Sequence, residues 1–174
     1  MHSYEFSTTA LRDTYRPFVR GIAGTMAAYL AVPTLVHPLE LVTAEACANV
    51  VRHAYPDGQP GPLRVRLMVT PRVGMELAVT DWGRGCAACP MPPPGLSGLS
   101  GLSGISGMSG ISGLSEVAPE ATSGRGLRII ACLCDAVTGA SGPDGNTLHL
   151  QLAIPEEQWR TSNLTITETS LLQR

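Results

Sequence analysis

The segment TAEACANVVRHAY, residues 43–55, decides how the rest of the chain is interpreted. Its polar residues Glu45, Asn49 and His53 are spaced four apart, so a helix of about 3.6 residues per turn places them along one stripe. Most of the other positions are apolar. A carboxylate, an amide and an imidazole are costly to bury in such a helix, which favours a functional site in front of them. A solvated polar face would give the same pattern and is the alternative.

Length and composition indicate one globular domain. The chain has 174 residues, of which 44% are hydrophobic and 15% charged, enough for one sizeable core. A net charge of -2 gives no electrostatic basis for binding nucleic acid or a membrane surface. All basic residues are arginine, which excludes lysine-dependent chemistry. Because no signal peptide or membrane span is evident, we expect a cytoplasmic chain with reduced cysteines.

The hydrophobic periodicities predict alternating blocks of strands and helices. Pro17 lies inside the first helical pattern and predicts either a kink or a later helix start. The order of blocks predicts an α+β fold, a two-layer α/β sandwich with a mixed, mostly antiparallel sheet and helices on one face. The expected elements are a strand at 3–7, helices at 10–30 and 37–55, strands at 63–70 and 74–80, a helix at 127–135, and strands at 136–140 and 146–154.

Low-complexity sequence interrupts this pattern. Residues 95–115 are seven consecutive triplets of glycine, an apolar residue and serine. A period of three matches neither a helix nor a strand, so we expect residues 90–115 to be a mobile insert. The single domain is expected to span residues 1–155, and residues 156–174 to form a loose polar tail.

Two glycine motifs follow predicted elements. Asp81-x-Gly83-x-Gly85 comes directly after a strand, where the carboxylate can accept a hydrogen bond from an exocyclic amine and glycines allow a ligand to approach the backbone. Residues 124–126, Gly-Arg-Gly, open a helix whose exposed N–H groups and dipole favour phosphate. Either motif alone could be an ordinary turn.

The cysteines offer a second chemistry. Cys86-x-x-Cys89 has a spacing that occurs in metal and redox sites. Cys132-x-Cys134 does not have the spacing of a zinc knuckle and lies in an apolar helix, which weighs against zinc or redox chemistry.

Taken together, the motifs resemble those of the GHKL superfamily of ATPases, and most of all the RsbW/SpoIIAB type of anti-sigma factor serine kinases. Residues 45–49 with 53–55 resemble the N box of that family, residues 81–85 its G1 box and residues 123–127 its G2 box. The resemblance covers roughly residues 3–155 apart from the insert, and it implies a Bergerat-type ATP-binding fold.

The resemblance also implies roles for single residues. Asn49 would hold Mg²⁺, Glu45 would act as the general base for a substrate serine, and Asp81 would accept the adenine amine, with Thr147 nearby. A solvated helix glutamate is the alternative for Glu45. The other implied nucleotide-binding residues are His53, Gly83, Gly85, Gly124, Arg125, Gly126, Leu127 and Thr147.

Three functions follow from the resemblance. The first is an ATP-dependent serine kinase that phosphorylates a STAS-type anti-sigma factor antagonist and sequesters a sigma factor, as a homodimer and without direct contact to nucleic acid or membrane. The second is a non-catalytic, nucleotide-dependent switch, because no charged residue lies between Arg84 and Glu116, where the family has its ATP lid. A histidine kinase is disfavoured, since His37 precedes Pro38 at a helix start and no phosphoacceptor hairpin precedes the domain.

Overall fold

We analysed a computed structural model, which describes residues 1–55, 59–84 and 125–160, with the backbone alone for Arg125. The insert at 90–115 and residues 161–174 lie outside the described residues, so the expectations for them remain predictions. Within the described residues no helix is long and apolar enough to cross a membrane.

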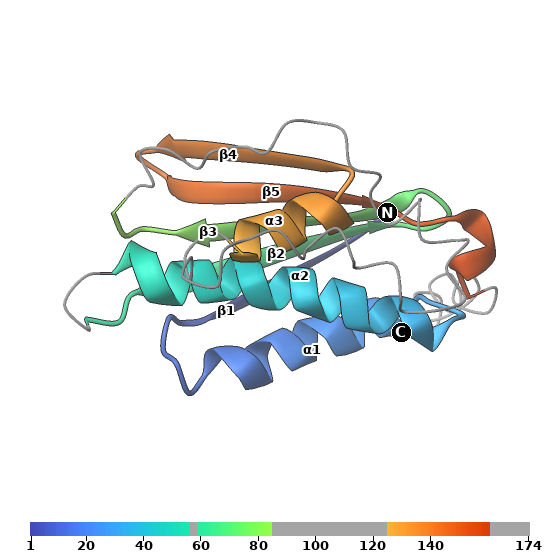
Figure 1. The fold of residues 1–174 in the computed structure, drawn as a ribbon, viewed down its shortest axis with the longest axis horizontal. Helices are drawn as coiled ribbons and strands as arrows, with labels where there is room; N and C mark the ends of the chain where they lie inside the picture. The colour runs from blue at the N-terminus through green and yellow to red at the C-terminus, as the bar shows by residue number, and fades with distance from the viewer. Residues whose placement is uncertain (56–58, 85–124, 161–174) are drawn as a thin grey trace, which may run out of the picture.

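One five-stranded sheet forms the first layer (Figure 1). Its order is β1-β2-β3-β5-β4, and each neighbouring pair is antiparallel. The strands predicted at 63–70 and 74–80 are confirmed, and they form an antiparallel hairpin whose register pairs Leu67 with Leu77. The strands are β1 His2–Thr9, β2 Pro62–Thr70, β3 Gly74–Asp81, β4 Ala136–Gly142 and β5 Gly145–Ala153.

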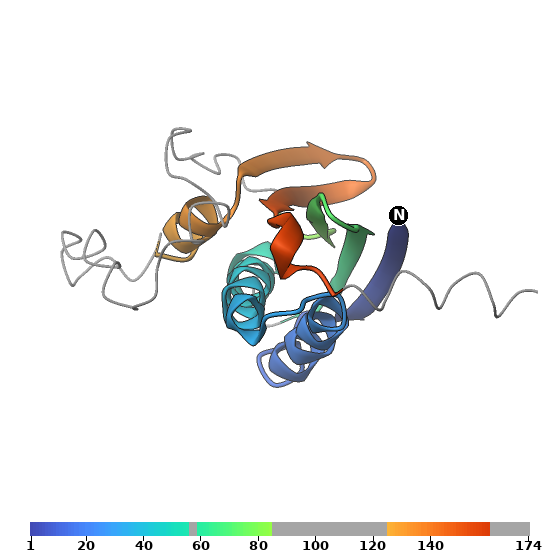
Figure 2. The same cartoon turned by 90° about the vertical axis from the view of Figure 1, so that its right-hand side faces the viewer.

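The three α-helices form the second layer and cover one face of the sheet (Figure 2). This arrangement confirms the predicted α+β sandwich, because a sheet with one apolar face must bury it against another layer. The α-helices are α1 Tyr15–Ala27, α2 Val36–Asn49 and α3 Arg125–Leu133. The short helical turns are η1 Pro33–Leu35, the π-helical η2 Val50–Ala54 and η6 Glu156–Gln158.

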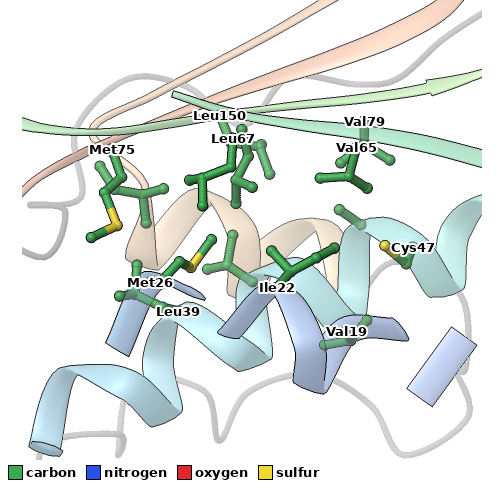
Figure 3. Packing of buried hydrophobic residues seen from close by; sticks show 14 of the residues in the cluster. Val19, Ile22, Met26, Leu39, Cys47, Val65, Leu67, Met75, Val79 and Leu150 are labelled. Carbon is green, nitrogen blue, oxygen red and sulfur yellow. The ribbon is translucent and has the colours of Figure 1, made fainter. Parts of the chain in front are cut away.

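The core lies between these layers (Figure 3). Alternate residues of β2 are buried, among them Val65 and Leu67, because successive side chains of a strand point to opposite faces. Ile22 and Leu39 face them from α1 and α2 (Figure 3) and have no exposed surface. The site described below lies at the ends of elements that this core holds in place.

The first helix begins five residues later than its hydrophobic pattern predicts. Pro17 occupies its first turn, where a missing N–H costs nothing, so the later start that this proline allows is confirmed. The Thr14 hydroxyl donates to the carbonyl of Thr9 at 3.0 Å and ties the helix start to the end of β1. Leu11 precedes the helix and is 40% exposed.

The predicted helix over 37–55 changes from α-helical to π-helical hydrogen bonding near its end. It is α-helical to Asn49 and π-helical from Val50 to Ala54. π-helical turns are rare and occur often at functional sites. Positions after Asn49 therefore do not follow the α-helical spacing that the sequence pattern assumed.

Residues 156–160 differ from the expected loose tail. Trp159 is 7% exposed and pairs with Leu30 in an isolated β-bridge. Its indole Nε1–H donates to the carbonyl of Ile154 at 3.0 Å, and the N–H of Ala31 donates to Gln158 at 2.7 Å. An indole that finds both an apolar surface and a hydrogen-bond acceptor is stably buried, so the folded unit extends beyond Pro155.

Candidate functional site

The part of the candidate site where the resemblance places the adenine base forms where β3 ends and β5 begins. Asp81 and Asn146 are register partners, and both point to the helix-covered face, the face on which Leu77 and Val79 are buried. Oδ1 of Asp81 accepts hydrogen bonds from the N–H of Gly83 at 2.9 Å and from Nδ2 of Asn146 at 3.0 Å. Nδ2 of Asn146 also donates to the carbonyl of Gly83 at 3.2 Å. Among the described residues, Asp81 Oδ2 and Asn146 Oδ1 remain as acceptors for a ligand.

The structure places Thr147 elsewhere than the resemblance implied. Thr147 pairs with Thr80, and the two hydroxyls are 2.9 Å apart on the uncovered face of the sheet. Because strand side chains alternate, a residue next to Asn146 cannot share its face. The expected position of Thr147 beside Asp81 is therefore wrong, and Asn146 occupies it. The cross-strand partner of Asp81 was the signal that sequence reasoning missed.

Gly83 makes a close contact with protein backbone. A Cβ atom at Gly83 would lie 2.1 Å from the carbonyl oxygen of Ala54, at the end of η2. The N–H of Arg84 donates to the same oxygen at 2.7 Å, and the Tyr55 hydroxyl accepts from the N–H of Trp82 at 3.0 Å. Gly83 thus lets the loop after β3 lie directly on η2, an approach that only glycine permits.

The phosphate side of the site lies on α2. Glu45 and Asn49 are half-buried there, one turn apart, as the predicted stripe required. His53 is exposed, and none of its described contacts reaches Glu45 or Asn49. Arg52 instead reaches Glu45, with 3.5 Å between its Nη2 and Oε2 of the glutamate. Arg52 lies in the π-helical η2, where the α-helical spacing no longer holds, so Arg52 and not His53 is the third side chain beside this pair.

The first turn of α3 lies directly on this pair. Gly126 is buried, and a Cβ atom there would lie 2.5 Å from Oε2 of Glu45 and 3.6 Å from Oδ1 of Asn49. The structure therefore brings the N-box residues and the G2-box glycine together, although 77 to 81 positions separate them (126 − 49 = 77, 126 − 45 = 81). Leu127 packs against the core and fixes the helix on α2.

Part of the predicted site lies outside the described residues. Gly85 and Gly124 belong there, as does the side chain of Arg125, whose backbone begins α3. Cys86 and Cys89 also lie outside, and the described residues contain no cluster of three metal-binding side chains. The zinc alternative therefore gains no support from the described part of the chain.

The described groups fit a nucleotide bound with Mg²⁺. Two carbonyl-type acceptors, on Asp81 and Asn146, suit an exocyclic amine, and Asn49 offers the hard oxygen that Mg²⁺ prefers. Gly126 adds no side chain at the start of a nine-residue helix, where the dipole favours anions.

A separate hollow of about 290 Å³ lies on the uncovered face of the sheet. Glu76, His149 and Gln151 line it, from β3 and β5. These side chains alternate with the buried ones, so the hollow and the Asp81 site are on opposite faces. It does not contain any of the predicted site residues.

An antiparallel sheet with one layer of helices, an acceptor pair at a strand end and a glycine-led helix on a Glu/Asn stripe together define a nucleotide-binding domain. Residues 8–152 match the family model described as histidine kinase-like ATPase domain. Because the match covers well over half of the chain, the protein belongs to this family, in the GHKL superfamily of ATP-binding ATPase and kinase domains. No curated protein matches the chain significantly.

Proposed function

We propose that this protein is an ATP-dependent protein serine kinase that acts as an anti-sigma factor. The observation that supports it most strongly is the position of Glu45, one turn from Asn49 and next to the space that a side chain at Gly126 would fill. Phosphoryl transfer requires a carboxylate to orient the attacking hydroxyl, whereas nucleotide binding alone does not. A carboxylate at the phosphate end of the site is therefore the feature that separates a kinase from a simple binding module.

Each residue has a distinct role in the proposal. Asp81, held by Asn146 and by the N–H of Gly83, accepts the adenine amine. Asn49 offers its Oδ1 to Mg²⁺, and Mg-ATP supplies the phosphoryl group. Glu45 accepts the proton of the substrate serine, whose oxygen takes the phosphoryl group as ADP leaves.

The proposed substrate is a serine of a STAS-type anti-sigma factor antagonist, and the proposed second partner is a sigma factor. The protein would act in the cytoplasm as a homodimer, without binding nucleic acid itself. The net charge of -2 supports the last point, because phosphate backbones attract basic surfaces.

The test is transfer of phosphate from ATP to a protein serine. Purified wild-type protein is incubated with Mg-ATP and each of a panel of STAS-domain proteins, and phosphoserine is mapped by mass spectrometry. Glu45→Gln keeps the size of the side chain but removes its basicity, so we expect transfer to fall about 100-fold or more. Transfer that survives unchanged in Glu45→Gln would remove Glu45 from the mechanism. No transfer by wild type to any panel member would contradict the kinase.

The second candidate function is a non-catalytic switch, in which nucleotide binding controls the affinity for a partner protein. The absence of charged residues between Arg84 and Glu116 favours it, because such a lid carries no cation for the terminal phosphate. Partner release by ATP that persists in Glu45→Gln, without phosphoserine, would support the switch over the kinase.

A further inference from the structure

We propose that Arg52 is a positioning residue that fixes the carboxylate of Glu45 for proton transfer. This inference rests on the proposed serine kinase function and names a residue to which the family motifs gave no role. Two observations support it: the contact of Arg52 with Glu45, and the glycine next to the same carboxylate oxygen.

Arg52 reaches Glu45 from the π-helical turn. Its Nη2 lies 3.5 Å from Oε2 of Glu45, and the side chains are 42% and 23% exposed. The backbone of Arg52 belongs to η2. Ala54, the last residue of η2, lies against Gly83. The guanidinium thus extends from a turn that the loop after β3 holds in place.

Gly126, in α3, restricts the space around the same carboxylate oxygen of Glu45. A Cβ atom at Gly126 would lie 2.5 Å from Oε2 of Glu45, so the oxygen occupies the space that a side chain at this position of α3 would need. Oε2 therefore has a cation from η2 on one side and the start of α3 on the other. A glutamate side chain has three rotatable bonds, and two neighbours that meet one oxygen restrict them.

Position is what a general base requires. The base must lie within about 3 Å of the proton that it removes, and an error of about 1 Å can cost about 100-fold in rate. Without Arg52 the carboxylate would still be present but would sample several rotamers. We therefore expect the loss of Arg52 to lower kcat and to leave the KM for ATP nearly unchanged.

The ion pair contributes little to folding. Pairs between exposed charged side chains are weak because water and salt screen them. The variant Arg52→Met keeps most of the apolar stem of the side chain, so it is expected to fold like wild type. Arg66→Met is the matched control, since it breaks an exposed Arg66–Glu5 pair with a distance of 3.3 Å on the uncovered face of the sheet.

The kinetic test uses the STAS-domain substrate found in the transfer assay. We expect kcat to fall about tenfold or more in Arg52→Met, to recover to within about threefold of wild type in Arg52→Lys, and to stay unchanged in Arg66→Met. In a Glu45→Gln background, Arg52→Met should cause no further loss, because Arg52 acts through Glu45. Unchanged kcat in Arg52→Met, or an equal further loss in the double variant, would overturn the proposal.

A second readout does not depend on turnover. In uniformly ¹³C-labelled protein without nucleotide, the carboxyl carbon of Glu45, assigned by its loss in Glu45→Gln, should shift in Arg52→Met and not in Arg66→Met. An unmoved signal overturns the proposal even if wild type is an active kinase. If the signal moves but wild type transfers no phosphate, the contact is established and the kinase function itself is contradicted, so the two failures are distinguishable.

Discussion

Gly83 and Gly126 both belong to the motifs that identify the site, yet their surroundings differ. A side chain at Gly83 would meet the carbonyl oxygen of Ala54, which is part of the backbone. A side chain at Gly126 would meet the end of the Glu45 side chain, which can rotate away. At the scale of single residues, Gly83 supports the fold, and Gly126 leaves room for the proposed general base Glu45.

This difference predicts opposite effects of the same substitution. Gly83→Ala should lower the free energy of unfolding by about 1–3 kcal/mol, because the backbone of η2 must move. Gly126→Ala should leave that energy unchanged or raise it by up to about 1 kcal/mol, because alanine favours a helix. The same Gly126→Ala change should reduce serine phosphorylation about tenfold, since it displaces Glu45.

Urea unfolding of both variants, followed by circular dichroism, measures the two energies, and the transfer assay measures the second effect. Gly21→Ala is a suitable control, because a Cβ atom on that helical glycine would meet nothing within 4 Å. Equal destabilisation by Gly83→Ala and Gly126→Ala would contradict the distinction.

At the scale of elements, the C-terminal end of the described chain closes one end of the core. Residues 156–160 follow β5 and return to Leu30, just after α1, where Arg160 donates to the carbonyl of Leu30 at 2.6 Å. Trp159 fills the gap between these segments. The segment therefore joins the last strand to the first helix, elements that are far apart in the chain.

Trp159→Ala should reveal this role. Removing a buried tryptophan leaves a cavity, so the free energy of unfolding is expected to fall by about 3–5 kcal/mol. Glu157→Ala changes an exposed residue of the same segment and should have an effect below about 0.5 kcal/mol. If thermal and urea unfolding show similar values for the two variants, the segment is not part of the core.

The sequence predicted most elements because their signals are local. The alternation in β2 and β3 and the apolar period of α1 identify these elements without tertiary information. Three features were missed because they depend on contacts between distant segments. The π-helical η2 fits the loop after β3, the burial of Trp159 depends on Leu30, and the choice of Asn146 over Thr147 depends on its register with Asp81.

In the candidate site, too, the positions set by local sequence signals were predicted, and one that depends on the irregular end of a helix was missed. The structure brings Glu45 and Asn49 next to Gly126 and places Asp81 at the end of β3, because helical spacing and strand ends can be read from the chain directly. Their roles in binding and catalysis stay predictions. Arg52 was missed because the residues after Asn49 form a π-helical turn, where the α-helical spacing that placed His53 on the stripe does not hold.

At the scale of the whole molecule, the free energy of unfolding should fall as the pH becomes alkaline. Burial raises the pKa of the Cys47 thiol to about 12, and burial together with Asp135 raises that of Cys134 to about 12, from an ordinary value of 9.0. Burial also raises the pKa values of Tyr29 and Tyr55. The unfolded chain loses these protons first, so stability is complete below about pH 9 and falls as the pH rises toward 12.

Urea unfolding between pH 8 and pH 10.5 measures this slope, and the chain contains no lysine that would titrate in the same range. Cys47→Ala should make the slope shallower without abolishing it, because Cys134 and the two tyrosines contribute with the same sign. Cys132→Ala, which removes a partly exposed thiol, serves as the control. A slope that Cys47→Ala leaves unchanged would contradict the buried, protonated thiol.

The central claim is that Asp81, with Asn146 and not Thr147, forms the base side of one ATP site. The most direct measurement is calorimetric titration of Mg-ATP into wild type, Asp81→Asn and Thr147→Val. Asp81→Asn keeps an oxygen for Gly83 and Asn146 but turns the other acceptor into a donor, so affinity should fall at least about tenfold, or about 1.4 kcal/mol. Thr147→Val changes the opposite face of the sheet and should bind like wild type. Equal binding by wild type and Asp81→Asn, or loss of binding in Thr147→Val, would contradict this site.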